Sequence, residues 1–307
     1  MERRIVALGY ARFVRILETL GTVKKTKNTE AAPKAKEDAL RALMIGDVVG
    51  KPGRMIVTRF LPEIRARYGI DFVVANAENA AGGSGITPEI HNALLRAGVD
   101  CITLGDHAFR AKSIFPILNA KAPRIIRPAN FPSEAPGYGM IVLDAPGNDK
   151  RPSIKVAVFT MLGRIFIQQP VDNPLTTAEK LLARIPDVRV RLLDFHAEAT
   201  SESQIMGRFL DGKVSAVFGT HTHVATADET ILPGGTAYQT DVGMTGPFES
   251  IIGRRIENVV DNFRTGRPSN FDVADKDVRI NGALVDIDPM SGKTIRMERF
   301  VFAEDGE

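Results

Sequence analysis

From residue 41 onward, short apolar runs alternate with stretches whose apolar positions recur at helical spacing. The runs in RALMIGD, DFVVANAEN and VDCITLGDH predict buried strands, whereas RMIVTRFLPEIRARYG and TPEIHNALLRAG predict helices. A turn is expected at Lys51-Pro52-Gly53 before the first helix, and Thr87 is placed to cap the second. This alternation predicts an α/β fold in which helices cover a sheet.

The second half of the chain continues the alternation and then changes character. SIKVAVFTML, VRVRLLDFHAEAT and VSAVFGTHTH predict further strands, with helices expected around 175–184 and 201–210. The C-terminal segment VRINGALVDIDPMSGKTIRMERFVF has two alternating runs joined by a Met-Ser-Gly turn, which predicts an antiparallel hairpin. Residues 40–307 contain no fixed-period repeat and no long linker, so we expect one domain.

Residues 1–39 differ from the rest of the chain. Within residues 4–20, charged side chains interrupt the apolar positions, so neither a membrane span nor a secretory signal is expected. The lysine-rich stretch TVKKTKNTEAAPKAKEDA that follows is typical of a linker. We therefore expect a basic, flexible extension, with a partner-binding helix or a targeting role as alternatives.

Charge and cysteine content narrow the class of protein. The net charge is +3, but residues 1–39 carry nine Lys/Arg and five Asp/Glu, so residues 40–307 are close to neutral. A near-neutral body argues against binding to extended nucleic acid. The single cysteine, Cys101, excludes an intrachain disulfide and favours a reducing, cytoplasmic compartment. Because it begins an apolar strand, we expect it to be buried rather than nucleophilic.

Polar residues gather at the carboxyl ends of the predicted strands. Ligands of open α/β sheets bind at this edge, so these side chains should converge there. Four of the five histidines belong to the set, whereas His91 lies mid-helix and is expected at the surface. The candidates are Asp47, Glu78, Asn79, Asp106, His107, His196, His221 and His223.

The candidates form a mixed oxygen and nitrogen ligand set, which favours Mn, Fe or Zn over Ca. They are too many for one four-coordinate ion, so two ions with a bridging carboxylate fit better, an arrangement that serves phosphoryl transfer. His221-Thr222-His223 would place both imidazoles on one side if it were extended. Each element also has a plain structural reading: an Asp after a strand is usually a turn residue, and His196 alone could be a core histidine.

Two glycine-rich segments do not indicate a nucleotide-binding fold. Gly46–Lys51 is one residue short of a phosphate-binding loop, and Pro52 stands where the magnesium-binding Ser or Thr would be. Gly82–Gly85 follows a strand but lacks the GxGxxG spacing. Neither segment therefore enters the candidate site.

The order of the motifs resembles the calcineurin-like metallophosphoesterases, and more closely the bacterial YmdB-like subfamily. The resemblance rests on MIGDVVGKPGR, NAENAAGGSGIT, ITLGDHAF, RPANFP, DFHAEATSE, FGTHTHVATADETILPGGTAYQTDVGMTGP and NGALVDID. It covers about residues 42–303 and implies a four-layer α/β/β/α metallophosphoesterase sandwich with a dinuclear metal centre. The two ions would be divalent or mixed-valence, Fe or Mn ahead of Zn. The implied ligands are Asp47, Glu78, Asn79 and His223 for one ion and Asp106, His196 and His221 for the other, with Glu78 bridging.

The resemblance also implies an activity. A metal-bound hydroxide would attack the phosphorus, and His107 would contact the phosphate and protonate the leaving oxygen. Subfamily members hydrolyse cyclic nucleotides, so small 2′,3′-cyclic nucleotides are the implied substrate, and a monomer or a homo-oligomer is compatible with this class. The alternatives are a phosphatase or nuclease acting on another phosphoester, and a nucleotide-binding regulatory protein with little turnover.

The sequence departs from the family pattern at two places. The usual strand-end Asn of GNH is Asp106, whose extra negative charge should hold the ions more tightly and weaken the attraction for an anionic phosphate. The Trp-Asp that often follows is Phe109-Arg110, a change expected to affect substrate contacts. Val48-Val49 after Asp47 differs from the superfamily but matches the subfamily.

Overall fold

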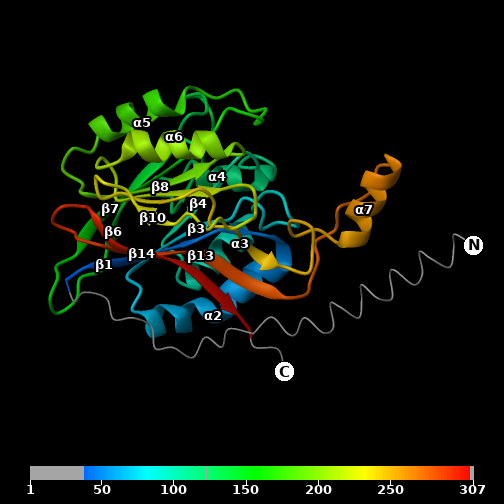
Figure 1. Cartoon of the computed structure of the whole chain (residues 1–307), viewed down its shortest axis with the longest axis horizontal. Coiled ribbons are helices and arrows are strands. Elements are labelled where there is room, and N and C mark those ends of the chain that lie inside the picture. The colour runs from blue at the N-terminus through cyan, green and yellow to red at the C-terminus, as the bar shows by residue number, and fades with distance from the viewer. Residues whose placement is uncertain (1–37, 122, 305–307) are drawn as a thin grey trace, which may run out of the picture. The chain divides into compact units, whose positions relative to one another are not determined.

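The computed structural model describes residues 38–121 and 123–304 (Figure 1). These residues lie within one compact unit, Pro33–Glu307. The extension expected at residues 1–39 falls outside the described residues except for its last two, 38 and 39.

Two sheets form the centre of the fold. In the first, the order is β2 (Asp47–Val48), β12 (Met244–Pro247), β13 (Val278–Ile287), β1 (Leu40–Ile45), β3 (Phe72–Asn76), β4 (Cys101–Thr103) and β5 (Ile125–Ile126), and β14 (Thr294–Ala303) pairs with β13. In the second, the order is β10 (Thr230–Ile231), β11 (Ala237–Gln239), β9 (Ala216–Thr220), β8 (Val190–His196), β7 (Ile154–Leu162) and β6 (Met140–Ala145). Strands β1, β3, β4 and β5 are parallel, as are β7, β8, β9 and β11. Each sheet therefore has an edge at which several carboxyl ends meet.

Helices cover the outer face of each sheet, so that α2 and α6 lie on opposite sides of the pair in Figure 1. The helices on the first sheet are α2 (Gly50–Tyr68), α3 (Pro88–Arg96), the short 3₁₀ helix η1 (Lys112–Ile114) and α4 (Phe115–Leu118). Those on the second are α5 (Pro174–Ala183) and α6 (Thr200–Leu210). A last helix, α7 (Ile256–Thr265), buries none of its residues and projects from the body in Figure 1.

Three apolar clusters separate these layers. The middle cluster joins the sheets, with Met44 and Val74 from the first packed among Val158, Leu192 and Phe218 from the second. One outer cluster lies between the first sheet and α2 and α3, and the other between the second sheet and α5 and α6. The predicted four-layer α/β/β/α sandwich is confirmed.

Strand β1 shows how the sequence pattern produces these layers. Leu40 and Met44 belong to the cluster between the sheets, while Leu43 and Ile45 belong to the cluster under the helices. Successive side chains point to opposite faces, so a strand covered on both faces needs apolar residues at nearly every position. The continuous apolar runs in the sequence reflect this double burial.

Arg41 is the polar exception in β1. It is 2% exposed; its Nε lies 2.7 Å from Asp286 Oδ1, and its Nη2 donates to Oδ2 at 2.9 Å. Arg41→Ala would leave the buried Asp286 carboxylate without this partner, so we expect the free energy of unfolding to fall by about 3–5 kcal/mol. Urea titration measures this loss. Lys155→Ala, which removes an exposed pair with Asp144 at 3.5 Å, is the control and should cost less than about 1 kcal/mol; equal losses would contradict the prediction.

Several local predictions are confirmed. The Thr87 side chain accepts a hydrogen bond from the Ile90 backbone N–H at 3.5 Å and caps α3. The C-terminal hairpin forms as an antiparallel pair of β13 and β14. Cys101 is fully buried, and burial raises the pKa of its thiol, which is unsuited to a nucleophile.

Two local predictions are wrong. Helix α2 already begins at Gly50, so Lys51-Pro52-Gly53 lies in its first turn, where proline is tolerated because the first amides have no intrahelical acceptor. His91 is 6% exposed instead of lying at the surface, because it shares the buried face of α3 with Leu94. Burial lowers the pKa of its imidazole, whose Nδ1 lies 3.1 Å from Asn92 Oδ1.

None of the described helices is both long enough and apolar enough to cross a bilayer.

Candidate metal centre

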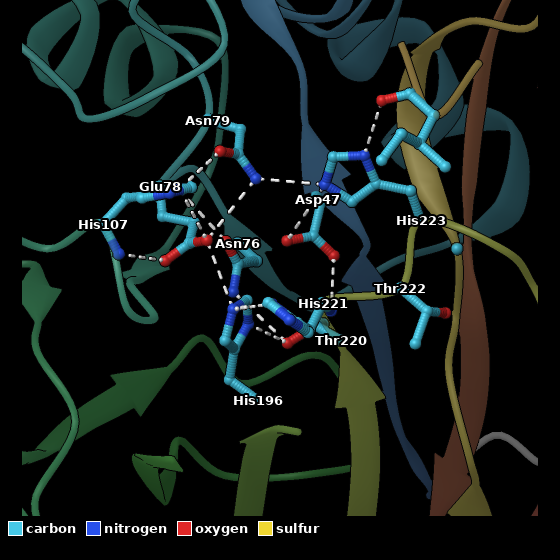
Figure 2. A network of polar contacts seen from close by, with 12 residues as sticks. Asp47, Asn76, Glu78, Asn79, His107, His196, Thr220, His221, Thr222 and His223 are labelled. Atoms are coloured by element: carbon cyan, nitrogen blue, oxygen red, sulfur yellow. Dashed lines mark hydrogen bonds and ion pairs between the residues drawn. The ribbon is translucent and has the colours of Figure 1, made fainter. Parts of the chain in front are cut away.

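The candidate site residues lie together at the carboxyl ends of strands from both sheets (Figure 2). The first sheet supplies the residues that follow β1, β3 and β4, namely Asp47, Glu78, Asn79, Asp106 and His107. The second supplies His196 at the end of β8, and His221 and His223 after β9.

Four of these residues form a tight cluster. Glu78, Asp106, His196 and His221 each place one ligand atom within 4.8 Å of the others. His196 Nε2 lies 3.2 Å from Glu78 Oε1, 3.2 Å from Asp106 Oδ1 and 2.9 Å from His221 Nδ1. Two carboxylates and two imidazoles make a donor set suited to a transition-metal ion.

A second group adjoins this cluster. His223 Nε2 lies 3.1 Å from Asn79 Nδ2 and 4.0 Å from Asp47 Oδ1. Asn79 Nδ2 is also 3.5 Å from Glu78 Oε1, so Glu78 borders both groups, as a bridging carboxylate must. Asn79 directs its amide nitrogen at His223, and coordination through its oxygen would require the amide to turn over.

Two of the histidines are held in a defined tautomer. The Thr220 hydroxyl donates to Asp194 Oδ1 at 2.6 Å and lies 2.9 Å from His196 Nδ1, so the imidazole must donate from Nδ1. His221 Nε2 lies 3.1 Å from Glu198 Oε2 and is the donor there. His196 Nε2 and His221 Nδ1 are therefore the ring nitrogens that face the cluster, and they are the two atoms available to ligate a metal once they are deprotonated.

The His221-Thr222-His223 segment is not extended, contrary to the prediction. His221 and His223 have φ values of 113° and 66°, which send their imidazoles into different groups. Thr222 stabilises this uncommon backbone, because its N–H and hydroxyl both donate to Asp241 Oδ2 at 2.9 and 2.8 Å. His223 Nδ1 donates to the Ile252 carbonyl at 2.9 Å, which leaves Nε2 facing the site.

A buried carboxylate lies beneath the cluster. Asp194 accepts hydrogen bonds from Asn76 Nδ2 at 3.0 Å, from Thr220 Oγ1 and from Thr103 Oγ1. Burial raises its pKa, while the nearby His196 charge and these hydrogen bonds act to lower it. Asp194 thereby fixes Thr220, and through Thr220 the orientation of His196.

The site concentrates negative charge in a buried place. Burial raises the pKa of Asp47 and of Asp241 to about 7 each. Burial acts to raise the pKa of Glu78 as well, but the charge of His196 and hydrogen bonds from His107 and His196 hold it well below its ordinary value. Burial acts to lower the pKa of His196, but the Glu78 charge and hydrogen bonds with Asp106 and Glu78 raise this pKa well above that of an ordinary histidine. A bound divalent cation would stabilise these carboxylates in their charged form.

One buried atom tests whether a metal fits here. Asp47 Oδ1 has no hydrogen-bond partner among the described residues, although it is fully buried. A buried carboxylate oxygen without a donor is costly unless a cation neutralises it. The donors around it and around Glu78 are carboxylates, imidazoles and an amide, so the residues fit a pair of transition-metal ions.

His107 lies beside the cluster in a different arrangement. Its Nδ1 lies 2.9 Å from Asn79 Oδ1 and 3.3 Å from Glu78 Oε1, while its Nε2 is 3.7 Å from Asp106 Oδ2. The hydrogen bond with Glu78 raises the pKa of His107 against the effect of burial. The side chain is 25% exposed, so a protonated His107 is accessible for proton transfer at Nε2.

Phe109 and Arg110, which stand where the family pattern often has Trp-Asp, lie in different surroundings. Phe109 packs edge-to-face on Phe115, with ring centroids 5.8 Å apart, and in a tilted arrangement on Phe131, with centroids 5.1 Å apart. Arg110 is exposed. The effect of Phe109-Arg110 on substrate contacts stays a prediction.

The residues that orient the histidines are not among the candidates predicted from the sequence. The sequence could have pointed to Asp194, because it lies two residues before His196 and therefore on the same face of the strand. No feature of the sequence points to Ile252, since it acts through its backbone carbonyl. The orienting residues are Asp194, Glu198, Thr220, Asp241 and Ile252.

Known proteins resemble this chain over most of its length. The family model described as YmdB-like protein matches residues 43–300. The chain belongs to the YmdB-like family. The predicted membership is thus confirmed, and the match contains every candidate metal ligand of this YmdB-like protein.

Relatives of this YmdB-like chain are similar over nearly their whole length. A Bacillus subtilis protein named 2′,3′-cyclic-nucleotide 2′-phosphodiesterase is 43% identical over 270 residues, covering 87% of this chain and 98% of the relative. The crystal structure of a hypothetical protein from Thermus thermophilus is 40% identical with a TM-score of 0.78, covering 86% of this chain and 100% of that one. The structure of a novel phosphatase from Mycoplasma pneumoniae is 34% identical with a TM-score of 0.79, covering 88% and 95%.

Proposed function

We propose that this YmdB-like protein is a dinuclear metal-dependent phosphodiesterase that hydrolyses 2′,3′-cyclic nucleotides. The observation that carries the proposal is the convergence of Glu78, Asp106, His196 and His221 at one strand edge. The name of the Bacillus subtilis relative supplies the reaction and the substrate class. The Bacillus subtilis and Mycoplasma pneumoniae relatives are named as a phosphodiesterase and a phosphatase, and both names denote hydrolases acting on phosphoesters.

The proposed ligands fall into two sets that share Glu78. When bound, the two ions supply positive charge that lowers the pKa of water and neutralises the phosphate. Fe or Mn, divalent or mixed-valence, suits the donors best, and Zn is the alternative. One set is Glu78, Asp106, His196 and His221, and the other is Asp47, Glu78, Asn79 and His223.

His107 is the proposed general acid. Hydrolysis of the cyclic diester breaks a P–O bond and leaves negative charge on a ribose oxygen, which must take up a proton. His107 Nε2 gives this proton, while the contact of Nδ1 with Glu78 Oε1 at 3.3 Å holds the ring.

Hydrolysis of 2′,3′-cyclic AMP by the purified protein tests the proposal. The assay contains added Mn²⁺ or Fe²⁺, with a chelated sample as the control. Chelator-sensitive release of nucleoside monophosphate supports a metal phosphodiesterase. Turnover of phosphomonoesters or nucleic-acid ends alone would favour another phosphoester substrate, and equilibrium binding of the cyclic nucleotide without product would favour a regulatory protein.

Asp106→Asn tests the charge that this chain adds to the family pattern. Asn still offers an oxygen ligand but removes one negative charge next to His196 and His221. We expect weaker metal retention and a several-fold lower KM for the anionic substrate, because less negative charge repels the phosphate. Metal titration against a chelator and steady-state kinetics measure the two effects. Asp144→Asn, at an exposed position, is the control; unchanged retention and KM in Asp106→Asn would contradict the argument.

A further inference from the structure

The loop of residues 163–169 between β7 and α5 is fastened at both ends to residues of the metal centre. The Gly163 N–H donates to the His196 carbonyl at 2.9 Å. The Gln169 side-chain amide donates to the Asp106 carbonyl at 3.2 Å. The loop therefore starts and ends at the rim of the site.

Glu202 in the first turn of α6 shapes the first half of this loop. Its carboxylate accepts hydrogen bonds from the backbone N–H groups of Arg164, at 2.8 and 3.1 Å, and Ile165, at 2.9 Å. A Cβ atom at Gly163 would lie 2.6 Å from Glu202 Oε2 and 2.9 Å from Ala197 Cβ, so only glycine fits there. The turn is thus held by specific contacts.

Phe166 lies in this turn with an unusual backbone conformation and an unusually exposed side chain. Its φ is 64° and it is 83% exposed. A bulky residue rarely adopts a left-handed backbone, and a large apolar side chain gains by burial. Because packing within the chain explains neither feature, both point to a contact with another molecule.

The metal centre leaves one part of a nucleotide without a partner. Its carboxylates, imidazoles and amide suit metal ions, phosphate and ribose hydroxyls, and in the proposed function its imidazoles serve metal ligation and proton transfer and not the nucleobase. Bases stack on aromatic side chains with little dependence on sequence. Phe166 provides such a ring on a loop joined to His196 and Asp106.

We propose that Phe166 stacks on the nucleobase of the substrate and that loop 163–169 selects nucleotides over phosphodiesters without a base. This inference rests on the proposed function and extends it from the reacting phosphate to the base. Glu202 is then a positioning residue, which holds the turn but does not contact the substrate.

Phe166→Gly removes the ring and retains the loop, because glycine adopts a positive φ without strain. We expect the kcat/KM ratio of 2′,3′-cyclic AMP to base-free ribose 2′,3′-cyclic phosphate to fall about 5- to 100-fold, the contribution of one base–aromatic stack. Phe166→Trp should retain the ratio. Phe263→Ala, which removes a 92% exposed ring from α7, is the matched control and should not change it.

Binding of a 2-aminopurine nucleoside monophosphate provides a readout independent of turnover. The protein has no tryptophan, so the fluorescence of the base can be followed directly. Stacking should quench it with the wild-type protein and not with Phe166→Gly.

The outcomes separate the two proposals. If the wild type hydrolyses neither substrate, the proposed function fails, while the quenching still tests Phe166. If it hydrolyses both and Phe166→Gly leaves the ratio and the quenching unchanged, the stacking proposal is wrong. A changed oligomeric state of Phe166→Gly with an unchanged ratio would equally overturn it, because the ring would then face a second copy of the chain.

Discussion

Glu78→Gln is expected to abolish metal retention and phosphodiesterase turnover together while leaving the fold intact. Glu78 is fully buried and borders both groups of ligands, so the loss of its charge affects both ions. Gln has nearly the same size but binds cations poorly. Turnover should fall by at least about 1,000-fold, because the ions supply several kcal/mol of transition-state stabilisation. Metal content, kcat and thermal unfolding are measured on one preparation.

Two further variants make this result specific. Asp47→Asn acts on the second group, at the carboxylate whose Oδ1 lacks a partner among the described residues, and should also lose metal and turnover. Glu63→Gln, at an exposed position on α2, is the matched control and should retain both. Full metal content and activity in Glu78→Gln would contradict the shared-carboxylate assignment.

His107→Ala is expected to slow turnover of 2′,3′-cyclic AMP by about 10²–10⁴-fold and to spare the metal, as loss of a general acid does. His107 Nε2 lies 3.7 Å from Asp106, and its Nδ1 contacts Asn79 and Glu78, so the ring stands beside the ligands. The kcat value and the metal content are compared with those of the wild type.

The leaving group gives the sharper test of this role. A p-nitrophenyl diester has an acidic leaving group that departs without a proton, so His107→Ala should slow its hydrolysis far less than that of the cyclic nucleotide. Equal losses on both substrates would show that His107 acts otherwise. Loss of the metal from His107→Ala would make it a ligand and overturn the assignment.

Much of the architecture could be read from local patterns. The double burial of β1 and its neighbours appears in the sequence as continuous apolar runs, and parallel pairing of β3 with β4 places Glu78 and Asp106 at one edge of the first sheet. His196 joins them from the second sheet. Two predictions were wrong, the turn at Pro52 and the surface position of His91, because the periodicity of apolar residues does not determine the structure at either position. A proline fits both a turn and a first helical turn, and one polar residue does not reveal which face of a helix is buried.

The geometry of the site depended on contacts between distant parts of the chain. The proton position on His196 follows from Thr220, 24 residues away, and the contact of Thr103 with Asp194 spans 91 residues. The turned backbone at His221 and His223 depends on Asp241, which holds Thr222. No local pattern specifies such pairings, because they form only when the two sheets pack.

The α/β class, the family and the residue types gathered at the strand ends follow from local periodicity and short motifs along the chain. The nitrogen of each histidine that faces the cluster, the carboxylate that borders both groups and the position of Phe166 emerge only in the folded protein. These features are set by hydrogen bonds and burial across the two sheets, and their free energies arise only in the packed fold.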